Sequence, residues 1–445
     1  MSTFLRKYNR FLLRLSPQSN LVYGFFIYNL IGFLLLCLPF ARKTSLSVID
    51  VLFASTSAIS TTGLLTLSMP DDFTFFGQFV IMLLFQIGGI GYMTFTTYIL
   101  LNTNKKASAW RQRILSAAFS LPDSLKLKPF LKSVIVFTVI FEVIGTIFFY
   151  IGFADQPWGF WERLWNSFFH SVSAFCTAGF SLFNSGFIDY VGDGWINFTI
   201  SLLAISGSLG FIVFTDLWMM VSKKKHKLSF TSKIIVSGFV CLLLAGTSIM
   251  YFAEPVIASL KAPGRFYAAF FQSMSAMTTV GFNTLDFGSF GLAITMITIL
   301  LMYIGASPSG TSGGLKITTF IASIAYLRSR LKNCKDVLFL NRFIPEQRVH
   351  VAVSTFIFYL MISFLGILLL SFSEDFPLDR IAFETLSALG TVGLSTGITG
   401  DLTIFGKIVI IILMFIGRLG VLTFGLAISR TYIATNHETK EDLAI

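Results

Sequence analysis

The sequence predicts an all-α integral membrane protein in which one unit of three segments is repeated four times. Two observations predict this fold class: the composition and an internal repeat. Hydrophobic residues make up 54% of the 445 residues, and charged residues only 12%. Soluble domains carry about 25% charged residues, so a chain this apolar is expected to lie in a lipid bilayer.

Eight apolar stretches are long enough to cross about 30 Å of hydrocarbon as helices. They lie near residues 21–40, 77–101, 130–153, 194–221, 232–253, 289–327, 350–372 and 403–430. Within each successive pair lies a shorter apolar stretch, at 48–64, 164–180, 266–282 and 381–394. Each short stretch reaches at most halfway through a membrane. The first long stretch is interpreted as a membrane helix, because it exceeds the roughly 7–15 apolar residues of a signal peptide.

Loop charge predicts the orientation of these helices. The loops after the second helix of each pair are basic, as in "NTNKKASAWRQR" and "LRSRLKNCKDVLFLNR", whereas loops such as "MPDD" and "SEDFPLDR" are acidic. Basic loops stay in the cytoplasm, so both termini are predicted to be cytoplasmic and the chain to be a multi-pass protein of the cell membrane. The basic runs are short and tethered at the membrane, so no nucleic-acid partner is expected.

The four short stretches align without gaps. They read "LFASTSAISTTGL" (52–64), "FFHSVSAFCTAGF" (168–180), "FFQSMSAMTTVGF" (270–282) and "AFETLSALGTVGL" (382–394). Each carries Ser-Ala at the same place and ends in Gly followed by Leu or Phe. The four glycines, which lie 116, 102 and 112 residues apart, are Gly63, Gly179, Gly281 and Gly393. The chain is therefore predicted to contain four repeats within one membrane domain, bounded at 1–101, 102–222, 223–330 and 331–445.

Re-entrant loops restrict the architecture. Non-helical backbone at membrane depth survives only where protein buries it or water lines it, and four similar loops satisfy this by meeting on one axis. The peptide carbonyls before each glycine are then expected to line a pore and to replace an ion's hydration shell, and the C-terminal ends of the short helices favour a cation. The residues assigned to this ion filter are Thr61, Thr62, Gly63, Cys176, Thr177, Ala178, Gly179, Thr279, Val280, Gly281, Thr391, Val392 and Gly393. Helix caps with no role in conduction are the alternative, which does not explain why all four copies agree.

The second helices of the pairs also align, and the third departs from the others. Three read "FQIGGIGYMTF" (85–95), "AISGSLGFIVF" (204–214) and "MFIGRLGVLTF" (414–424), whereas the third reads "MYIGASPSGTSGG" (302–314). Their glycine-rich centres, which permit close packing or a bend, are Gly88, Gly207, Gly305 and Gly417. The proline and small residues of the third copy break a helix, which predicts a mobile loop that obstructs the pathway on the cytoplasmic side of the filter.

The gate is assigned to this loop and to one arginine. Its residues are Gly305, Pro308, Gly310, Gly313, Gly314, Lys316 and Arg418. A static kink is the alternative, and a phosphate-binding loop is disfavoured because Leu315 separates Gly314 from Lys316. Arg418 aligns with Gly89, Ser208 and Ala306. An arginine at a helix centre costs about 2.5–3.5 kcal/mol on insertion scales, so we expect it to face the pore or a polar partner.

Several polar residues leave alternatives open. Arg418 either acts as a barrier or tether for the loop or binds carbonyls freed by a helix break, and Lys316 does the same or extends to the inner membrane surface. Glu142 and Asp216 are expected to make hydrogen bonds between helices, and His170 and Glu384 to brace the filter. The four cysteines stand alone, and neither a disulfide framework, a metal centre nor an enzyme is predicted.

The four glycine repeats, the interruption of the third pair and the arginine of the fourth resemble the Trk/Ktr/HKT superfamily of potassium transporters, most closely the bacterial Ktr membrane subunits. The resemblance covers nearly the whole chain. It implies four M1–pore helix–M2 repeats that form a pseudo-tetrameric, potassium-channel-like pore, usually as a homodimer. It implies K⁺ as the transported ion, with Na⁺ dependence open. It also implies a cytosolic RCK-type regulatory ring that binds the nucleotide, since this chain has no such domain or cofactor of its own.

The resemblance maps the filter glycines to the four positions above, the gating loop to 305–316 and the pore-facing arginine to Arg418. Some plant relatives carry Ser at the first glycine and pass sodium, so glycine at all four positions favours potassium. Each copy has one glycine only, and Ala178 departs from the TVGYG pattern, so looser selectivity is expected. A sodium or non-selective cation pore and a coupled secondary transporter of another solute remain as alternatives. The four-fold repeat argues against the second of these.

Overall fold

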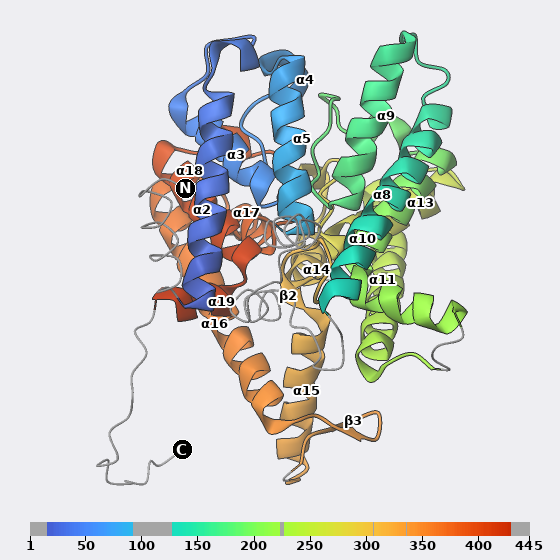
Figure 1. Ribbon diagram of the computed structural model, residues 1–445, viewed down its shortest axis with the longest axis vertical. Helices are drawn as coiled ribbons and strands as arrows, with labels where there is room; N and C mark the ends of the chain where they lie inside the picture. Colours follow the sequence, from blue (N-terminus) through green and yellow to red (C-terminus); the bar gives the residue numbers. More distant parts are fainter. Residues whose placement is uncertain (1–15, 92–126, 223–226, 306, 335, 429–445) are drawn as a thin grey trace.

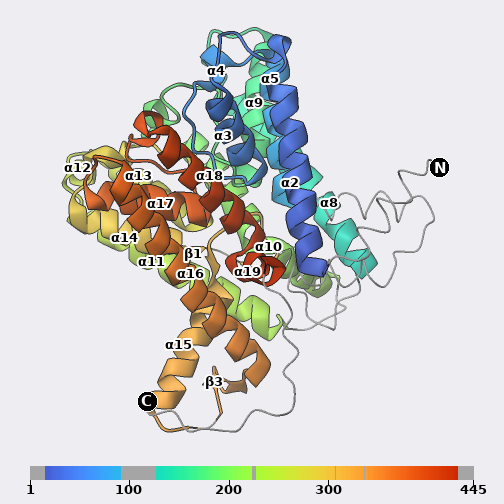
Figure 2. The same ribbon diagram turned by 90° about the vertical axis from the view of Figure 1, so that its left-hand side faces the viewer.

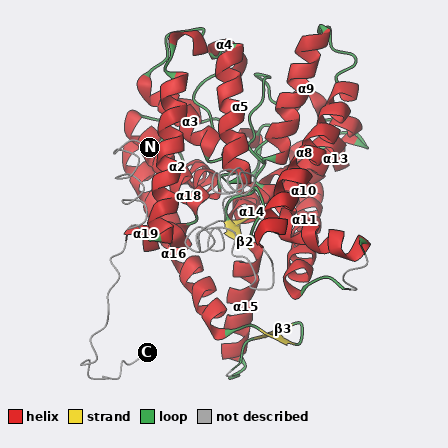
Figure 3. Cartoon of the chain, in the orientation of Figure 1, coloured by secondary structure: helices red, strands yellow, loops and turns green. Residues whose placement is uncertain are grey.

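The computed structural model describes residues 16–91, 127–222, 227–305, 307–334 and 336–428, and these are mostly helical (Figures 1 and 3). The basic loop 102–113, the predicted part of the first pair's second helix beyond 91, and both predicted cytoplasmic termini lie outside the described residues. In each quarter of the chain a long helix precedes a buried short helix, which precedes a further helix.

The helices of the first two quarters are α2 (Pro17–Leu36), α3 (Val48–Ile59), α4 (Met69–Asp72), α5 (Phe75–Ile90), α8 (Leu127–Gly152), α9 (Phe160–Phe175) and α10 (Gly194–Val221). Those of the third quarter are α11 (Phe230–Ala253), α12 (Pro255–Ala258), α13 (Gly264–Thr278), α14 (Leu292–Tyr303) and α15 (Ile317–Leu331). Those of the fourth are α16 (Glu346–Ser373), α17 (Leu378–Gly390), α18 (Ile404–Leu419) and α19 (Val421–Ile428). Single 3₁₀ turns lie at η1 (Pro39–Ala41), η2 (Ile188–Tyr190), η3 (Phe287–Ser289) and η4 (Thr399–Asp401).

Five described helices are long and apolar enough to cross a membrane: α2, α8, α10, α11 and α16. A sixth span results if α18 and α19, which meet at 99°, are one bent segment. The sequence predicted eight spans, and the remaining two are represented by the shorter apolar helices α5 and α14. Helix α14 ends early because the chain is interrupted after Tyr303, whereas α5 ends close to the limit of the described residues. The chain is thus a multi-pass, helical membrane protein.

The short helices α3, α9, α13 and α17 form the centre of the structure. Each is buried along its C-terminal half and packs against longer helices, for example α9 against α8 and α13 against α11. One phenylalanine at the same register in each short helix is fully buried, and these residues are Phe53, Phe169, Phe271 and Phe383. The long helices α8 and α16 expose apolar side chains such as Val139 and Phe364 on their outer faces, as expected for contact with lipid.

The second helices bend at a glycine that follows the predicted centre. Helix α10 contains a kink at Gly210, where φ is 81°, and α5 and α18 end at Gly91 and Gly420, with φ of 86° and 84°. The sequence placed the bend or the close packing at Gly88, Gly207 and Gly417. The kink of α10 and the ends of α5 and α18 lie three residues later, at glycines whose positive φ is one that favours glycine.

The third pair is interrupted over residues 304–316, here called the interrupted segment. Its ends are joined by a parallel pair of two-residue strands, β1 (Ile304–Gly305) and β2 (Leu315–Lys316). Helix α15 then leaves the body of the molecule together with the start of α16, and Figures 1 and 2 show both projecting beyond the other helices. An antiparallel hairpin of β3 (Leu338–Phe339) and β4 (Arg342–Phe343) connects them at the tip.

Candidate functional site

The four Thr-x-Gly segments lie at the C-terminal ends of the four short helices and share one backbone conformation. The threonines Thr61, Thr177, Thr279 and Thr391 are left-handed, with φ between 49° and 57°. The glycines Gly63, Gly179, Gly281 and Gly393 also have positive φ, between 70° and 93°. Left-handed backbone costs roughly 1–2 kcal/mol for a residue with a Cβ, so the surrounding structure must hold these threonines in place.

The four segments contact one another in a closed order. A Cβ atom built on Gly63 would lie less than 3.0 Å from the carbonyl oxygen of Ala178. The same is true of the remaining pairs, which are Gly179 with Val280, Gly281 with Val392, and Gly393 with Thr62. Each glycine therefore lies against the carbonyl that precedes the next glycine, and no other residue fits these positions. Residues 61–63, 177–179, 279–281 and 391–393 are here called the glycine ring.

A serine of each short helix holds its ring segment. The N–H group before each glycine donates to the carbonyl oxygen of this serine, at 2.8–3.2 Å in all four copies. The side chains differ: Ser57 and Ser387 accept from the N–H groups of their glycines at 3.1 Å, whereas Ser173 donates to the carbonyl of Phe180 and Ser275 to that of Phe282. Sequence reasoning noted Ser-Ala in each copy but gave the serine no role. Its identical register in all four copies was the available signal.

Glycines of the second helices allow close contact with the ends of the short helices. A Cβ on Gly88 would meet the carbonyl of Ile59 at less than 3.0 Å, and Gly207 and Gly417 stand in the same relation to Phe175 and Leu389. The third copy departs, because Gly305 lies against the carbonyl of Gly313 in its own interrupted segment. The predicted close packing at these glycines is therefore present.

The interrupted segment lies against the threonines of the ring. The N–H of Gly313 donates to Oγ1 of Thr279 at 3.1 Å. Oγ1 of Thr311 is 3.2 Å from Oγ1 of Thr177 and donates to the carbonyl of Phe175 at 3.1 Å. Ala306, within this segment, lies outside the described residues. The segment thus contacts the ring on its threonine side.

The kink in α10 provides the partners of the interrupted segment. In a continuous helix the N–H groups of residues 211 and 212 would bind the carbonyls of residues 207 and 208. The freed carbonyls of Gly207 and Ser208 instead accept from the N–H groups of Thr311, at 3.0 Å, and Ser307, at 3.2 Å.

The freed N–H groups complete this exchange. Phe211 donates to the carbonyl of Ser309 at 3.2 Å, and Ile212 to its hydroxyl at 3.4 Å. The segment therefore satisfies these four backbone groups of the kink, as a buried helix break requires.

Arg418 joins α18 to two other parts of the site. Its guanidinium donates to the carbonyls of Gly88 and Gly89 on α5, both at 3.1 Å, and to the carbonyl of Thr311. The sequence left a tether for the loop and a bond to helix-break carbonyls as alternatives, and the structure contains both contacts. Lys316 donates to the carbonyls of Ser312 and Gly313 at 2.5 and 3.1 Å, so its ammonium lies inside the segment and does not extend to the membrane surface.

Other polar residues brace the chain that follows the ring. Nε2 of His170 accepts from the N–H of Leu182 at 3.2 Å. The carboxylate of Glu384 accepts from the N–H of Thr396 at 2.9 Å and from two nearby hydroxyls. Bracing was the role predicted for both. Asp216 accepts from Ser232 at the start of α11, which confirms the predicted bond between helices.

Glu142 of α8 reaches the filter segment indirectly. Its carboxyl group lies near the side chain of Gln86 on α5, but Oε1 has no hydrogen-bond partner among the described residues, so the predicted side-chain bond between helices stays a prediction. Oε1 of Gln86 in turn accepts from Sγ of Cys176 at 3.1 Å. The sequence predicted that Cys176 contributes its backbone carbonyl to the filter and that its thiol acts as a small apolar group. It did not predict this side-chain contact.

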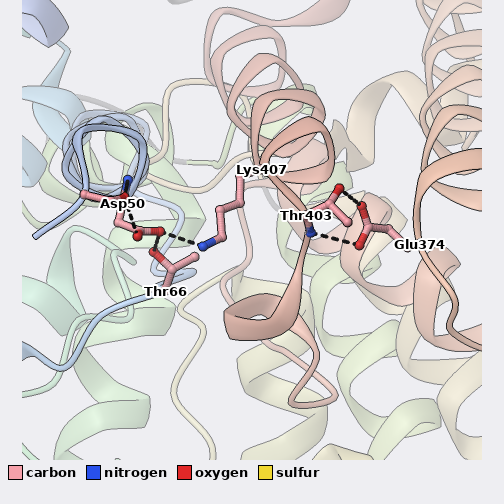
Figure 4. A network of polar contacts seen from close by, with 6 residues as sticks. Asp50, Thr66, Glu374, Thr403 and Lys407 are labelled. Carbon is pink, nitrogen blue, oxygen red and sulfur yellow. Dashed lines mark hydrogen bonds and ion pairs between the residues drawn. The ribbon is translucent and has the colours of Figure 1, made fainter.

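The first and fourth quarters meet at the other end of the short helices. Nζ of Lys407, in the first turn of α18, is 2.8 Å from Oδ1 of Asp50 on α3, and Thr66 donates to the same oxygen (Figure 4). Burial alone would raise the pKa of Asp50, but hydrogen bonds from Lys407, Ser47 and Thr66 hold this pKa below its ordinary value.

Beside this ion pair, the carboxylate of Glu374 accepts from the N–H and hydroxyl of Thr403, at 3.0 and 2.5 Å (Figure 4). This bond ties the end of α16 to the start of α18. The two contacts together fix the position of α18 far from its bend.

A cavity of about 330 Å³ adjoins the interrupted segment. It lies between α2, α16 and the junction of α18 with α19, and both Lys316 and Arg418 contribute to its wall. The interrupted segment lines it, but no residue of the glycine ring does. In the described part of the chain, no group of three His, Cys, Asp or Glu residues is placed to hold a metal ion.

Comparison with known proteins gives one consistent result. Residues 21–432 match the family model TrkH, described as cation transport protein. The chain is 36% identical to the Ktr system potassium uptake protein B of Bacillus subtilis over 94% of both chains, and 33% identical to the potassium/sodium uptake protein NtpJ of Enterococcus hirae over 96% and 97%. A crystal structure of the potassium transporter TrkH from Vibrio parahaemolyticus has the same fold, with a TM-score of 0.71 at 20% identity over 91% of this chain and 84% of that one.

Proposed function

The chain belongs to the TrkH family of cation transport proteins, and on that premise we propose that it is the ion-conducting membrane subunit of a potassium uptake system. Membership of a transport family agrees with the prediction that the chain is not an enzyme. In the proposed mechanism K⁺ moves down its electrochemical gradient, driven by the membrane potential, through four repeats arranged as a pseudo-tetrameric pore.

The observation that carries the proposal is the glycine ring. Four segments from distant parts of the chain close on one another, and each places a carbonyl against the next glycine. Carbonyl oxygens of such segments replace the water around a cation during conduction. The C-terminal ends of four short helices converge at the ring, and their partial negative charge favours a cation there. The carbonyls of the filter residues assigned from the sequence are proposed to supply this coordination.

K⁺ is the proposed ion because the B. subtilis relative is a potassium uptake protein. The E. hirae relative is a potassium/sodium uptake protein, so passage of Na⁺ or dependence on Na⁺ is the alternative outcome for this chain. The single glycine in each ring segment fits a filter with fewer carbonyl sites than a TVGYG channel has, and hence looser discrimination.

The interrupted segment is proposed to be the gate. It contacts ring threonines directly, and its backbone is held by hydrogen bonds to α10 and by Arg418 and Lys316. Hydrogen bonds of this kind contribute about 0.5–1.5 kcal/mol each, so a few of them are enough to hold a loop that still exchanges between two positions. The two half-buried cationic groups add an electrostatic barrier to a cation that approaches the segment.

The proposed setting is the cell membrane, with both termini and the basic loops in the cytoplasm. The projecting part of the chain (Figure 1) carries Arg328 and Arg330 on α15 and Arg342 on β4 of the hairpin. Such a surface suits anionic lipid headgroups and a cytosolic partner. A homodimer and an RCK-type ring that binds the regulatory nucleotide are proposed as the assembly. The name Ktr system for the B. subtilis relative fits a protein of several components.

Rubidium influx into cells without their own potassium uptake tests the function. Expression of the chain is expected to support growth at low potassium and to produce Rb⁺ influx, and Gly281→Ser is expected to lower the Rb⁺-to-Na⁺ selectivity about tenfold or more. The new side chain would collide with the carbonyl of Val392, and a misplaced carbonyl of this kind costs at least about 1.4 kcal/mol, which is tenfold.

Gly397→Ser is the matched control. Gly397 also has a positive φ, 95°, but no atom lies within 4 Å of a Cβ built on it. Equal selectivity in the two variants would contradict a carbonyl-lined filter at the ring. Influx only after co-expression of an RCK-type partner would show that the partner is required, whereas Na⁺ influx without Rb⁺ influx would show that the ion is wrong.

A further inference from the structure

The cavity beside the interrupted segment contains two cationic groups and no acidic one. Lys316 and Arg418 both contribute to its wall, and none of its lining residues is Asp or Glu. Their ammonium and guanidinium groups bind backbone carbonyls only. On the interrupted segment Arg418 binds the carbonyl of residue 311, and Lys316 binds those of the next two residues, 312 and 313. The two positive charges therefore lie close together, and each repels the other.

Each cationic group keeps one hydrogen-bond donor free. The ammonium of Lys316 has three N–H groups, of which two are used. The guanidinium of Arg418 has five, and its four hydrogen bonds leave one N–H of Nη1 without a partner in the described structure. Cationic groups held in a low-dielectric site are ordinarily paired with an acidic group, and no acidic residue of the described chain binds either of these two.

Two hydroxyl groups of the same wall also lack partners. Oγ of Ser312 and Oη of Tyr359 have no hydrogen-bond partner among the described residues, and both residues are buried. The carbonyl of Ser312 itself binds Lys316, and those of its neighbours Thr311 and Gly313 bind Arg418 and Lys316, whereas Tyr359 belongs to α16. The residues of the wall thus carry four unused donors from three elements of the chain, and the oxygens of the two hydroxyls are closed to solvent in this structure.

We propose that this cavity is a binding site for a small monovalent anion such as chloride. The unused N–H groups of Lys316 and Arg418 would hold the anion, and the hydroxyls of Ser312 and Tyr359 would complete its shell as charge-assisted donors. The remaining wall includes Leu21 and Phe25, and such an apolar surface favours a weakly hydrated monovalent anion over phosphate, which gives up its water reluctantly. Only the consequence for transport rests on the proposed function: a bound anion halves the positive charge beside the gate and lowers the barrier to a cation.

Anion binding is measured on the purified full-length protein without any transport, so it remains testable if the chain conducts no potassium. Potassium chloride replaces potassium gluconate at constant ionic strength, and the melting temperature is followed. We expect a saturable rise with chloride, because a ligand that binds only the folded state stabilises it. Lys316→Met is expected to raise the half-saturating chloride concentration at least tenfold. Lys407→Met, which removes a lysine far from the cavity, is expected to leave it unchanged.

Bromide diffraction provides the second measurement. Crystals grown with bromide are expected to show an anomalous peak in the cavity between Lys316 and Arg418. If Lys316→Met is too unstable to purify, Tyr359→Phe removes one donor only and is expected to raise the chloride midpoint about threefold. No chloride-dependent rise in the unaltered protein, the same midpoint in both lysine variants, or an absent bromide peak would each overturn the site.

Discussion

The second helix of the third repeat is interrupted in a different way from its three counterparts. Helices α5 and α18 end at a glycine, Gly91 or Gly420, and α10 is kinked at Gly210, with φ between 81° and 86° at all three glycines. The third copy has Pro308 at the aligned position and loses helical structure over residues 304–316. A glycine changes the direction of a helix at one residue, whereas a proline among small residues removes the N–H groups and side-chain contacts that would restart it.

The difference teaches how the break is stabilised. At Gly210 the freed groups of α10 bind the interrupted segment, so the two breaks satisfy one another. Arg418 donates to the carbonyls of Gly88 and Gly89 on α5. These carbonyls align with those of Gly207 and Ser208 on α10, which accept from the interrupted segment instead. One loop and one arginine satisfy backbone groups that a uniform set of four bent helices would leave exposed.

Shortening the interrupted segment is expected to have the largest effect. Removal of residues 308–311 deletes the carbonyl that binds Arg418 and three of the four hydrogen bonds to α10, and only the bond from Ser307 remains. If the segment is the gate, Rb⁺ influx rises roughly tenfold or more, since the loss of about 1.4 kcal/mol from a barrier is tenfold in rate. Influx per molecule at the membrane is the measurement. Lost influx in a protein that still melts cooperatively would favour a carrier with alternating access.

Gly210→Ala and Gly420→Ala separate the strain of a bend from its contact with the loop. Both positions have nearly the same φ, so each substitution costs about 1 kcal/mol or more in conformational strain. A Cβ at Gly210 would in addition lie 2.8 Å from Oγ of Ser307 and 2.9 Å from the N–H nitrogen of Gly310, whereas the nearest atom to one at Gly420 is 3.8 Å away. Gly210→Ala is therefore expected to lower the melting temperature more than Gly420→Ala does. It is also expected to change Rb⁺ influx severalfold, whereas Gly420→Ala should change influx little. Equal effects on influx would show that the loop does not depend on α10.

The ion pair of Asp50 with Lys407 should have the smallest effect, because it fixes α18 far from its bend. Asp50→Asn is expected to lower the free energy of unfolding at pH 7 by about 1 kcal/mol or less and to leave the Rb⁺ rate unchanged. Because the pKa of Asp50 is lowered in the folded state, its contribution is complete above the unfolded pKa of about 3.9 and is lost as pH falls through the folded pKa.

Melting temperatures of the two proteins are therefore expected to differ at pH 7 and to converge below about pH 4. Lys407→Met should reproduce the loss at pH 7. A change in influx or selectivity with either variant would contradict the separation between this outer contact and the gate.

Some features follow from residue types and spacing alone. The apolar stretches predict a multi-pass helical membrane protein, and the four aligned short stretches predict four equivalent segments that end in glycine. These predictions depend on composition and on the position of a residue within its repeat, and both are visible in the sequence of every copy. The Ser of each Ser-Ala pair and the buried phenylalanines had the same register, and they could have been found by asking what a residue repeated four times must contact.

The tertiary structure decided the remaining features. Which carbonyl meets which glycine, and which carbonyls bind Arg418, depend on contacts between residues far apart in the chain. A helix break can be read from local sequence because φ preferences are local. Where its freed backbone groups find partners depends on packing between helices, because buried N–H and C=O groups must be satisfied by whatever neighbour the fold provides.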